Sequence, residues 1–370
     1  AMLEIAGRYP DEPEIAVLAA HALLIPVRAD DLSGLEIALE TLEDVLRRRP
    51  NDTGAIHYYI HGTEFAERPG DALGYARRLG DLAPAASHLV HMPAHTYFRV
   101  GDYHDAGEAN AGAIDADMKW VTTGGDASAS WPLYYAHNLA FGLAGALMSG
   151  DAQLALKYAD HATMKWPEGA PMAQRSYPVA RTYVALGRHA PDRALAIPES
   201  SEADARIAVY RHYARGEALI IKGDLRGAAA EARAISKVSM DGRTTEQTLA
   251  RAVIDGRIAM AKGRYAKAAK LFGEAAELQE AELAESWDPP LWWYPVRRSH
   301  AAAKLLAGDY AAAEAEAVSA LDDWADDPLS MWVAGQAMRG QGKVREGDAM
   351  LAKARGLWYG DFDSISAEAI

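Results

Sequence analysis

Alanine- and leucine-rich stretches with helical periodicity alternate with short turns along most of this chain. Segments such as Arg251 to Lys262 and Ala266 to Glu282 carry apolar residues at the spacing of an amphipathic helix. No segment combines sustained alternation of apolar and polar residues with the composition of a strand. The pattern predicts an all-α protein.

Seven glycine-led turn motifs separate these stretches at intervals of 34 to 49 residues. A glycine suits the left-handed position that ends a helix, and an aspartate after it can cap the next helix. Each repeat is therefore predicted to be a helical hairpin, and hairpins at this period stack into a right-handed superhelix, an α-solenoid. The turn glycines are Gly101, Gly150, Gly187, Gly223, Gly263, Gly308 and Gly342.

The predicted domain organisation is a single solenoid over residues 1–370. Residues 1–150 form a histidine-rich half that holds a metal site, and residues 151–370 form the C-terminal repeats. The chain opens directly in helical register, so we expect it to be cut from a longer helical array.

Composition and charge narrow the classes of partner. A net charge of -14 argues against a nucleic-acid surface or an anionic membrane as partner. The absence of cysteine excludes disulfides, thiolate zinc sites and a cysteine nucleophile. The longest apolar run, residues 133–148, contains His137 and Asn138 and is too short for a membrane span. We expect a cytoplasmic protein, with the periplasm left open, and the oligomeric state is undetermined.

Histidines gather in one part of the chain. Five of the 12 lie between residues 57 and 95. On a helix, His57, His61 and Glu64 would share one face. His88, His91 and His95 would form a second stripe. Pro93 either kinks that helix or begins a new one near Met92, and in the second case the stripe is lost.

Several motifs resemble a known family. The segments GDYHDA, GRYAKA and GDYAAA look like the inter-helix turn of a tetratricopeptide repeat (TPR). More specifically, HYYIHGTE, SHLVHMPAHTYFRVGDY, YYAHN, WWYPVRRS and LWYGDF resemble a large group of bacterial TPR proteins with this histidine signature. That group generally has further helices upstream, and its HMPSH motif is HMPAH here, with Ala94 in place of serine.

The resemblance implies a location for the histidines. In TPR superhelices the first helix of each hairpin lines the concave groove, and neighbouring first helices lie about 8–10 Å apart. The predicted metal ligands, all on first helices of three consecutive hairpins, are His57, His61, His91, His95 and His137. Glu64 is either a further ligand, an orienting group or a general base, and His88 is expected to be an orienting or structural residue. The alternative to metal binding is that these histidines line a polar groove or form a buried hydrogen-bond network. Nitrogen and oxygen ligands without thiolate suit zinc, copper or iron.

Two functions stay open. The first is a metal-dependent enzyme, an oxidoreductase or hydrolase, acting on a small molecule in the groove. The second is a non-catalytic scaffold that binds a peptide or protein there. Predicted ligand contacts are Tyr134, Asn138, Arg175, Tyr177 and Arg297. Together with Arg181, these arginines would contribute to an anion- or aromatic-binding wall, and solvated surface charge is the alternative. Residues 292–294 are expected to start a helix and pack against the preceding hairpin.

Overall fold

A computed structural model describes residues 1–28, 30–123, 131–161, 172–199, 205–239, 244–283, 288 and 290–370, with only the backbone described at 131–133 and 172–178. These residues form helices, turns and loops, and they contain no strand. The predicted all-α class is confirmed.

The chain divides into two compact units, Ala1–Asp126 and Ala127–Ile370. The helices of the first unit are α1 (Met2–Arg8), α2 (Pro13–Leu24), α3 (Leu35–Arg48), α4 (Thr53–Phe65), the 3-10 helix η1 (Pro69–Ala72), α5 (Leu73–Leu82), α6 (Ser87–His91), α7 (Pro93–Arg99) and α8 (Tyr103–Thr122).

The second unit continues the same alternation of helix and short turn. Its elements are α9 (Trp131–Ser149), α10 (Ala152–His161), α11 (Met172–His189), α12 (Pro191–Leu195), α13 (Ala205–Ile221), α14 (Leu225–Ile235), α15 (Thr245–Ala261), α16 (Tyr265–Leu283), α17 (Val296–Leu306), α18 (Tyr310–Asp323), α19 (Pro328–Gly340), α20 (Val344–Leu357), and the 3-10 helices η2 (Phe362–Ser364) and η3 (Ala367–Ala369).

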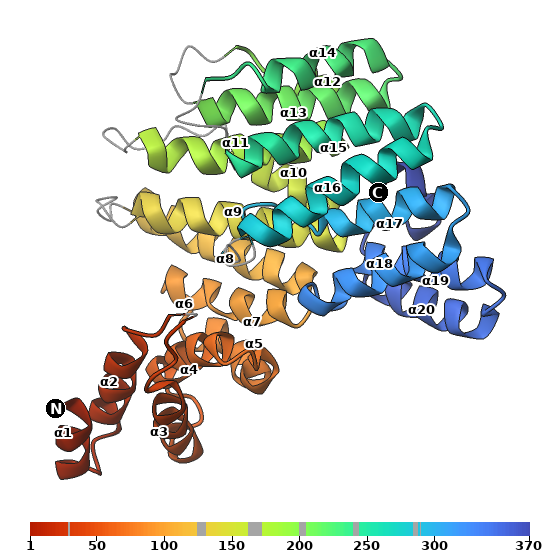
Figure 1. The fold of residues 1–370 in the computed structure, drawn as a ribbon. Helices are drawn as coiled ribbons and strands as arrows, with labels where there is room; N and C mark the ends of the chain where they lie inside the picture. The colour runs from red at the N-terminus through yellow and green to blue at the C-terminus, as the bar shows by residue number, and fades with distance from the viewer. Residues whose placement is uncertain are drawn as a thin grey trace. The chain divides into compact units, whose positions relative to one another are not determined.

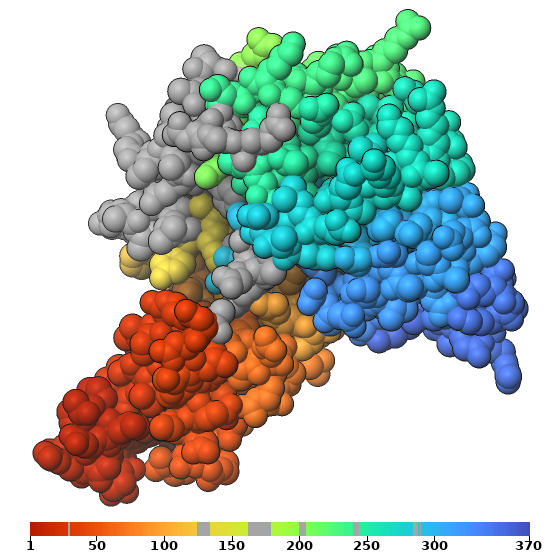
Figure 2. Space-filling model, viewed as in Figure 1, coloured from red at the N-terminus to blue at the C-terminus, as the bar shows by residue number. Residues whose placement is uncertain are grey.

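Within each unit, consecutive helices pack on one another as hairpins (Figure 1). Helices that are not consecutive also touch: α2 packs on α4 and α4 on α7 in the first unit, and α11 packs on both α9 and α13 in the second. In the space-filling view the second unit runs without a break from α16 in teal to α18 in blue (Figure 2). The buried positions are dominated by alanine, which lets helix axes approach closely. The hairpin prediction is confirmed, while the right-handed superhelix and the single solenoid stay predictions.

Six of the seven predicted turn glycines have a positive φ, as a left-handed helix end requires. Gly187 was predicted wrongly as a turn. It lies inside α11, where an added Cβ would come within 2.8 Å of the Ala214 backbone in α13. The glycine there serves close helix packing, and the turn comes later, at Ala190 before Pro191.

The predicted aspartate caps form at most of these turns. Asp151 accepts a hydrogen bond from the Leu154 amide at 2.9 Å, Asp224 from Gly227 at 2.9 Å, and Asp309 from Ala312 at 3.3 Å. Asp102 makes no capping bond and instead lies 3.9 Å from the Arg77 guanidinium. An aspartate in this position thus supports the next helix without being required for it.

Residues 292–294 differ from expectation in conformation but not in burial. They form an irregular segment before α17 rather than the start of a helix. The ring of Tyr213 in α13 contacts both Trp292 and Trp293 edge-on, with centroids 5.6 and 5.5 Å apart. The predicted burial is confirmed, but these ring contacts come from α13 and not from the preceding hairpin of α15 and α16.

The segment after α20 folds back over the second unit. The Tyr359 amide donates to the Ser149 carbonyl at 2.9 Å, and the Trp358 ring covers the Gly150 turn. Among the helices that the structure describes, none is long and apolar enough to cross a membrane.

Replacing Gly150 by alanine should destabilise the protein more than replacing Gly223. Both glycines have a φ near +80°, which costs an alanine about 1–2 kcal/mol. A Cβ at Gly150 would also lie 2.4 Å from the Trp358 ring, whereas nothing lies within 4 Å of one at Gly223. We expect an additional loss of about 1–3 kcal/mol for Gly150→Ala from overpacking. Equal losses in urea unfolding of the two variants would contradict this account.

Candidate metal centre

Helix α4 places three polar side chains on one face. Its start is fixed by Asp52, which accepts a hydrogen bond from the Ala55 amide at 3.0 Å. From there His57, His61 and Glu64 follow at helical spacing. The two histidines are half-buried and the Glu64 side chain is 1% exposed. The predicted shared face on this helix is confirmed.

The second histidine stripe is interrupted at Met92, but its rings still converge. Helix α6 ends at His91, and α7 begins with Pro93 in its first turn. Met92 between them keeps helical dihedrals, with φ -51° and ψ -36°. The helical path therefore continues through the kink. His91 and His95 remain one helical turn apart, with ring centroids 4.8 Å from each other.

Two neighbouring side chains determine which nitrogen of each buried ring carries its proton. Asn110 of α8 donates its amide NH2 to the Ala106 carbonyl at 2.8 Å, so its oxygen faces His91. The Nδ1–H of His91 donates to that oxygen at 2.7 Å. The Nδ1–H of His95 donates to Glu64 Oε2 at 3.0 Å. Both neutral rings are left with a lone pair on Nε2.

Those two Nε2 atoms are only 2.9 Å apart, and His91 and His95 are 1% and 2% exposed. Two lone pairs at this distance repel, so the geometry needs either a shared proton or a cation near both nitrogens. A histidine whose other nitrogen donates to a carboxylate or amide oxygen is the usual form of a metal-bound imidazole.

Glu64 lies at the junction of this network. Its Oε2 is also 3.9 Å from His61 Nδ1, and its Oε1 is 3.8 Å from the Arg99 Nε. The carboxylate therefore has the Arg99 guanidinium on one side and the imidazole nitrogens of His61 and His95 on the other. This position suits an orienting group for His95 and a nearby counter-charge for a cation.

A second facing pair lies beside the first. His57 Nε2 and His88 Nε2 are 3.1 Å apart, between α4 and α6. Burial, followed by the neighbouring His88 and His95, lowers the pKa of His57 to about 3, so this imidazole is neutral at pH 7. Its next neighbour along the chain, Tyr58, stacks on His21 of α2 with ring centroids 4.2 Å apart.

Within the first unit, two sets of three side chains bring one ligand atom each to within 4.8 Å of the others, a spacing that could hold a metal ion. One set is His57, His61 and His88, which are half-buried, and the other is His61, Glu64 and His95, of which the last two are buried. His88, expected only to be orienting or structural, is thus placed among the possible ligands.

The remaining predicted site residues belong to the second unit. His137 lies on α9 with Nε2 3.4 Å from the Asp288 carboxylate, and its role as a metal ligand stays a prediction. On the same helix Tyr134 is exposed and Asn138 is fully buried. Arg297 pairs with Glu280 and Glu316, each at 2.5 Å. The side chains of Arg175 and Tyr177 lie outside the described residues.

Another group of arginines forms a polar cluster in the second unit. Arg257 Nη1 donates to the Ala369 carbonyl at 2.8 Å, and Arg188 Nη2 donates to the same carbonyl at 3.2 Å. Ser299 Oγ donates to the main-chain oxygen of Ile370 at 2.5 Å. The segment around η3 thus docks on α15 and α17 through its main chain.

The charge of this cluster is only partly compensated. Arg257 lies 2.8 Å from Glu217, and Arg298 lies 2.9 Å from Asp327. Burial and then the nearby Arg257 lower the pKa of Arg188 to about 10, because guanidinium groups face one another here. Arg181, expected in an anion-binding wall, is instead buried and donates to the Pro290 carbonyl at 2.6 Å.

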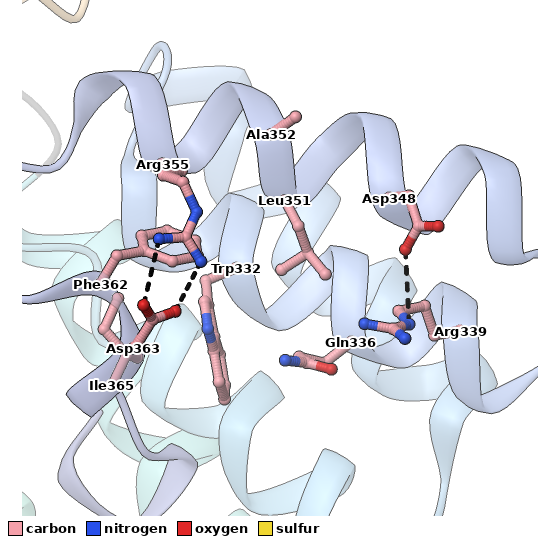
Figure 3. A pocket seen from close by; sticks show the side chains of 10 residues that line it. All are labelled: Trp332, Gln336, Arg339, Asp348, Leu351, Ala352, Arg355, Phe362, Asp363 and Ile365. Carbon is pink, nitrogen blue, oxygen red and sulfur yellow. Dashed lines mark hydrogen bonds and ion pairs between the residues drawn. The ribbon is translucent and has the colours of Figure 1, made fainter.

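An open pocket lies between α19, α20 and residues 362–365 (Figure 3). Its charged side chains pair with each other: Arg355 with Asp363 at 2.6 Å and Arg339 with Asp348 at 3.5 Å. The Arg355 guanidinium also lies over the Phe362 ring at 4.3 Å. This lining contains no histidine, so the histidine groups of the first unit are the stronger metal candidates.

Sequence reasoning missed Asn110 and the cluster of Arg188, Arg257 and Ser299. Asn110 had a weak signal, as a lone amide among alanines in the middle of a helix. The cluster had none, because its members come from three helices far apart in sequence.

Comparisons with known proteins find solved structures of low overall similarity. No protein-family model matches the sequence, and no curated protein shows significant similarity to it. The chain is 13% identical to the P58(IPK) TPR domain, over 95% of this chain and 94% of that one, with a TM-score of 0.28. It is 10% identical to yeast Tom70, over 98% of this chain and 89% of that one, with a TM-score of 0.38. It is 13% identical to human IFIT1 with m7Gppp-AAAA, over 94% of this chain and 72% of that one, with a TM-score of 0.33. Such scores carry no functional argument.

The ring protons can be located by NMR. In the metal-free protein at neutral pH, we expect both His91 and His95 to carry their proton on Nδ1. Asn110→Leu removes the acceptor for His91, so that ring should change tautomer while His95 serves as the internal control. The variant should also lose about 1–3 kcal/mol of stability, because a buried donor becomes unpaired. Absence of a proton from Nδ1 of His91 in the parent would refute this assignment.

Proposed function

We propose that this chain is a helical-repeat protein that binds a divalent metal ion through buried histidines of its first unit. The proposed ligands are His61 and His95, whose ligand atoms lie within 4.8 Å of each other and of Glu64, together with His91, whose Nε2 lies 2.9 Å from that of His95; Glu64 orients His95. The observation that carries the proposal is the pair of Nε2 lone pairs facing each other at 2.9 Å, each fixed by a partner on the opposite ring nitrogen. A shared proton would satisfy the same geometry, so metal titration is the decisive measurement.

The donor set fits a borderline metal. Imidazole nitrogen and one carboxylate suit zinc, copper and iron, and the general affinity order places copper first. When bound with an open coordination position, such an ion acidifies a water molecule, which is the basis of the metal-dependent enzyme hypothesis. In that hypothesis Glu64 is the residue near enough to act as a general base, although its bond to His95 favours an orienting role.

A second candidate function rests on the arginine cluster of the second unit. Arg188, Arg257 and Ser299 already hold main-chain oxygens of residues 369 and 370. Donation from fixed side chains to a peptide main chain is how many grooves bind extended segments. We infer that this cluster can hold a peptide of similar sequence, in competition with the chain's own segment.

The metal proposal predicts a clear ranking of variants in zinc titrations of tag-free protein. His61→Ala and His95→Ala should weaken binding by well over about 100-fold, because each removes a ligand. Glu64→Gln should cost only about 10- to 100-fold, as an orienting partner does. His104→Ala, a histidine of the same unit outside the cluster, should change nothing.

Two further readouts accompany the zinc titration. Saturation at about a hundredfold excess over Kd should stabilise the fold by about 2.7 kcal/mol. Affinity should fall as pH drops below about 6.5, since protons compete for imidazole. If His61→Ala and His95→Ala bind zinc, copper and iron as tightly as the parent and melt alike, the cluster is a hydrogen-bond network.

The peptide proposal predicts that unseating the terminal segment exposes a binding site. Ile370 is 2% exposed, so Ile370→Lys should displace it, whereas the exposed Glu368→Gln should not. We expect the peptide acetyl-Ser-Ala-Glu-Ala-Ile-amide to bind the full-length Ile370→Lys protein more tightly than the Glu368→Gln protein. Adding Arg257→Gln should weaken binding about tenfold or more, since hydrogen bonds to a charged donor are worth about 1.5–3 kcal/mol. Equal binding by all three proteins would remove the proposal.

A further inference from the structure

We propose that the first unit holds two metal positions, not one, and that they share His61. This inference rests on the proposed function and extends it. The inner position lies among His61, Glu64, His91 and His95, and the outer position lies among His57, His61 and His88.

The number of donors is the first argument. Five imidazoles and one carboxylate come together in this cluster, each within reach of at least one other member. A tetrahedral zinc ion takes four ligands. A single ion would leave at least two of these side chains facing it without a bond, whereas two ions use the whole set.

The arrangement of the donors is the second argument. The His57–His88 pair and the His91–His95 pair repeat the same geometry, with Nε2 atoms 3.1 and 2.9 Å apart. His61 lies between them, with its ring centroid 5.1 Å from that of His57 and 5.3 Å from that of His95. The two sets that could each hold an ion have only His61 in common.

If two ions share one imidazole, that imidazole must lose its N–H proton. A ring that binds a cation through each nitrogen has no position left for its proton, so the N–H bond breaks and the proton leaves to solvent. Two adjacent dications make this loss favourable, as a bound cation acidifies the groups that it contacts. Filling the second position should therefore release one proton more than neutral histidine ligands would.

The two positions differ in burial, which predicts the order of filling. Glu64, His91 and His95 are buried; His91 is held by Asn110, and His95 and Glu64 are held by each other. The outer histidines, His57 and His88, are half-buried. A preorganised, desolvated set binds more tightly than a partly exposed one. The inner position should fill first and the outer one at higher metal concentration.

The experiment is a metal count on the full chain by titration calorimetry and by elemental analysis after gel filtration, with zinc as the probe. We expect two equivalents in the parent, in two steps. His57→Asn and His88→Asn should each remove the weaker step, and Glu64→Gln should weaken the tighter one. His61→Ala should weaken both. His104→Ala should keep both, and circular dichroism should confirm that every variant is folded.

Copper supplies a second readout that does not depend on affinity. Two Cu²⁺ ions joined through one imidazole couple magnetically, so the doubly loaded parent should show a reduced electron paramagnetic resonance signal per copper. The His88→Asn protein should show the full signal of an isolated ion.

The outcomes separate this inference from the proposed function. No metal bound by the parent overturns both. One equivalent in the parent, or two equivalents that persist in His57→Asn and His88→Asn with an uncoupled copper signal, overturns the shared centre and leaves a metal-binding protein. Two equivalents of zinc in the parent support the shared centre, provided that His57→Asn and His88→Asn each lose the weaker step and Glu64→Gln weakens the tighter one.

Discussion

No helical hairpin of this length can bury its apolar face alone, so each one depends on the next. Consecutive helices pack within both units, and alternate helices such as α11 and α13 touch directly. Close approach requires small residues at the contact, which is why an added Cβ at Gly187 would meet the Ala214 backbone at 2.8 Å. Stability of such stacks is a sum over neighbouring repeats, and it is this packing that holds polar side chains from different helices together.

The histidine centre uses that rigidity directly. Its buried pair needs Glu64 from α4, His91 from α6, His95 from α7 and Asn110 from α8, four elements that approach one another only when the hairpins are stacked. The kink at Pro93 helps rather than hinders, because Met92 keeps helical dihedrals and both rings stay on the same side. The orientation of these side chains is thus fixed by packing, and a preorganised set of this kind is what tight and selective binding of an ion would require.

Features that depend on local geometry were predictable from the sequence, and those that depend on distant partners were not. The all-α class and six of the turn glycines follow from periodicity and from the need for a positive φ at a helix end. The shared face of His57, His61 and Glu64 follows from helical spacing alone. The turn predicted at Gly187 was wrong because close helix packing and turn formation both favour glycine, so the residue type alone does not distinguish them. Asn110, and the contact of Arg257 with residue 369, are set by tertiary neighbours that no spacing in the sequence reveals.

The two units handle buried polar groups in opposite ways, and this bears on what each can bind. Burial of an imidazole favours its neutral form, as the lowered pKa of His57 shows, and a neutral ring keeps a lone pair for a cation. A guanidinium stays charged when buried and must be paired, so Arg257 and Arg298 each have a carboxylate partner. The guanidinium N–H groups that are not used in these ion pairs can donate to carbonyl oxygens or to anions. The same degree of burial therefore favours cation binding in the first unit and main-chain or anion binding in the second.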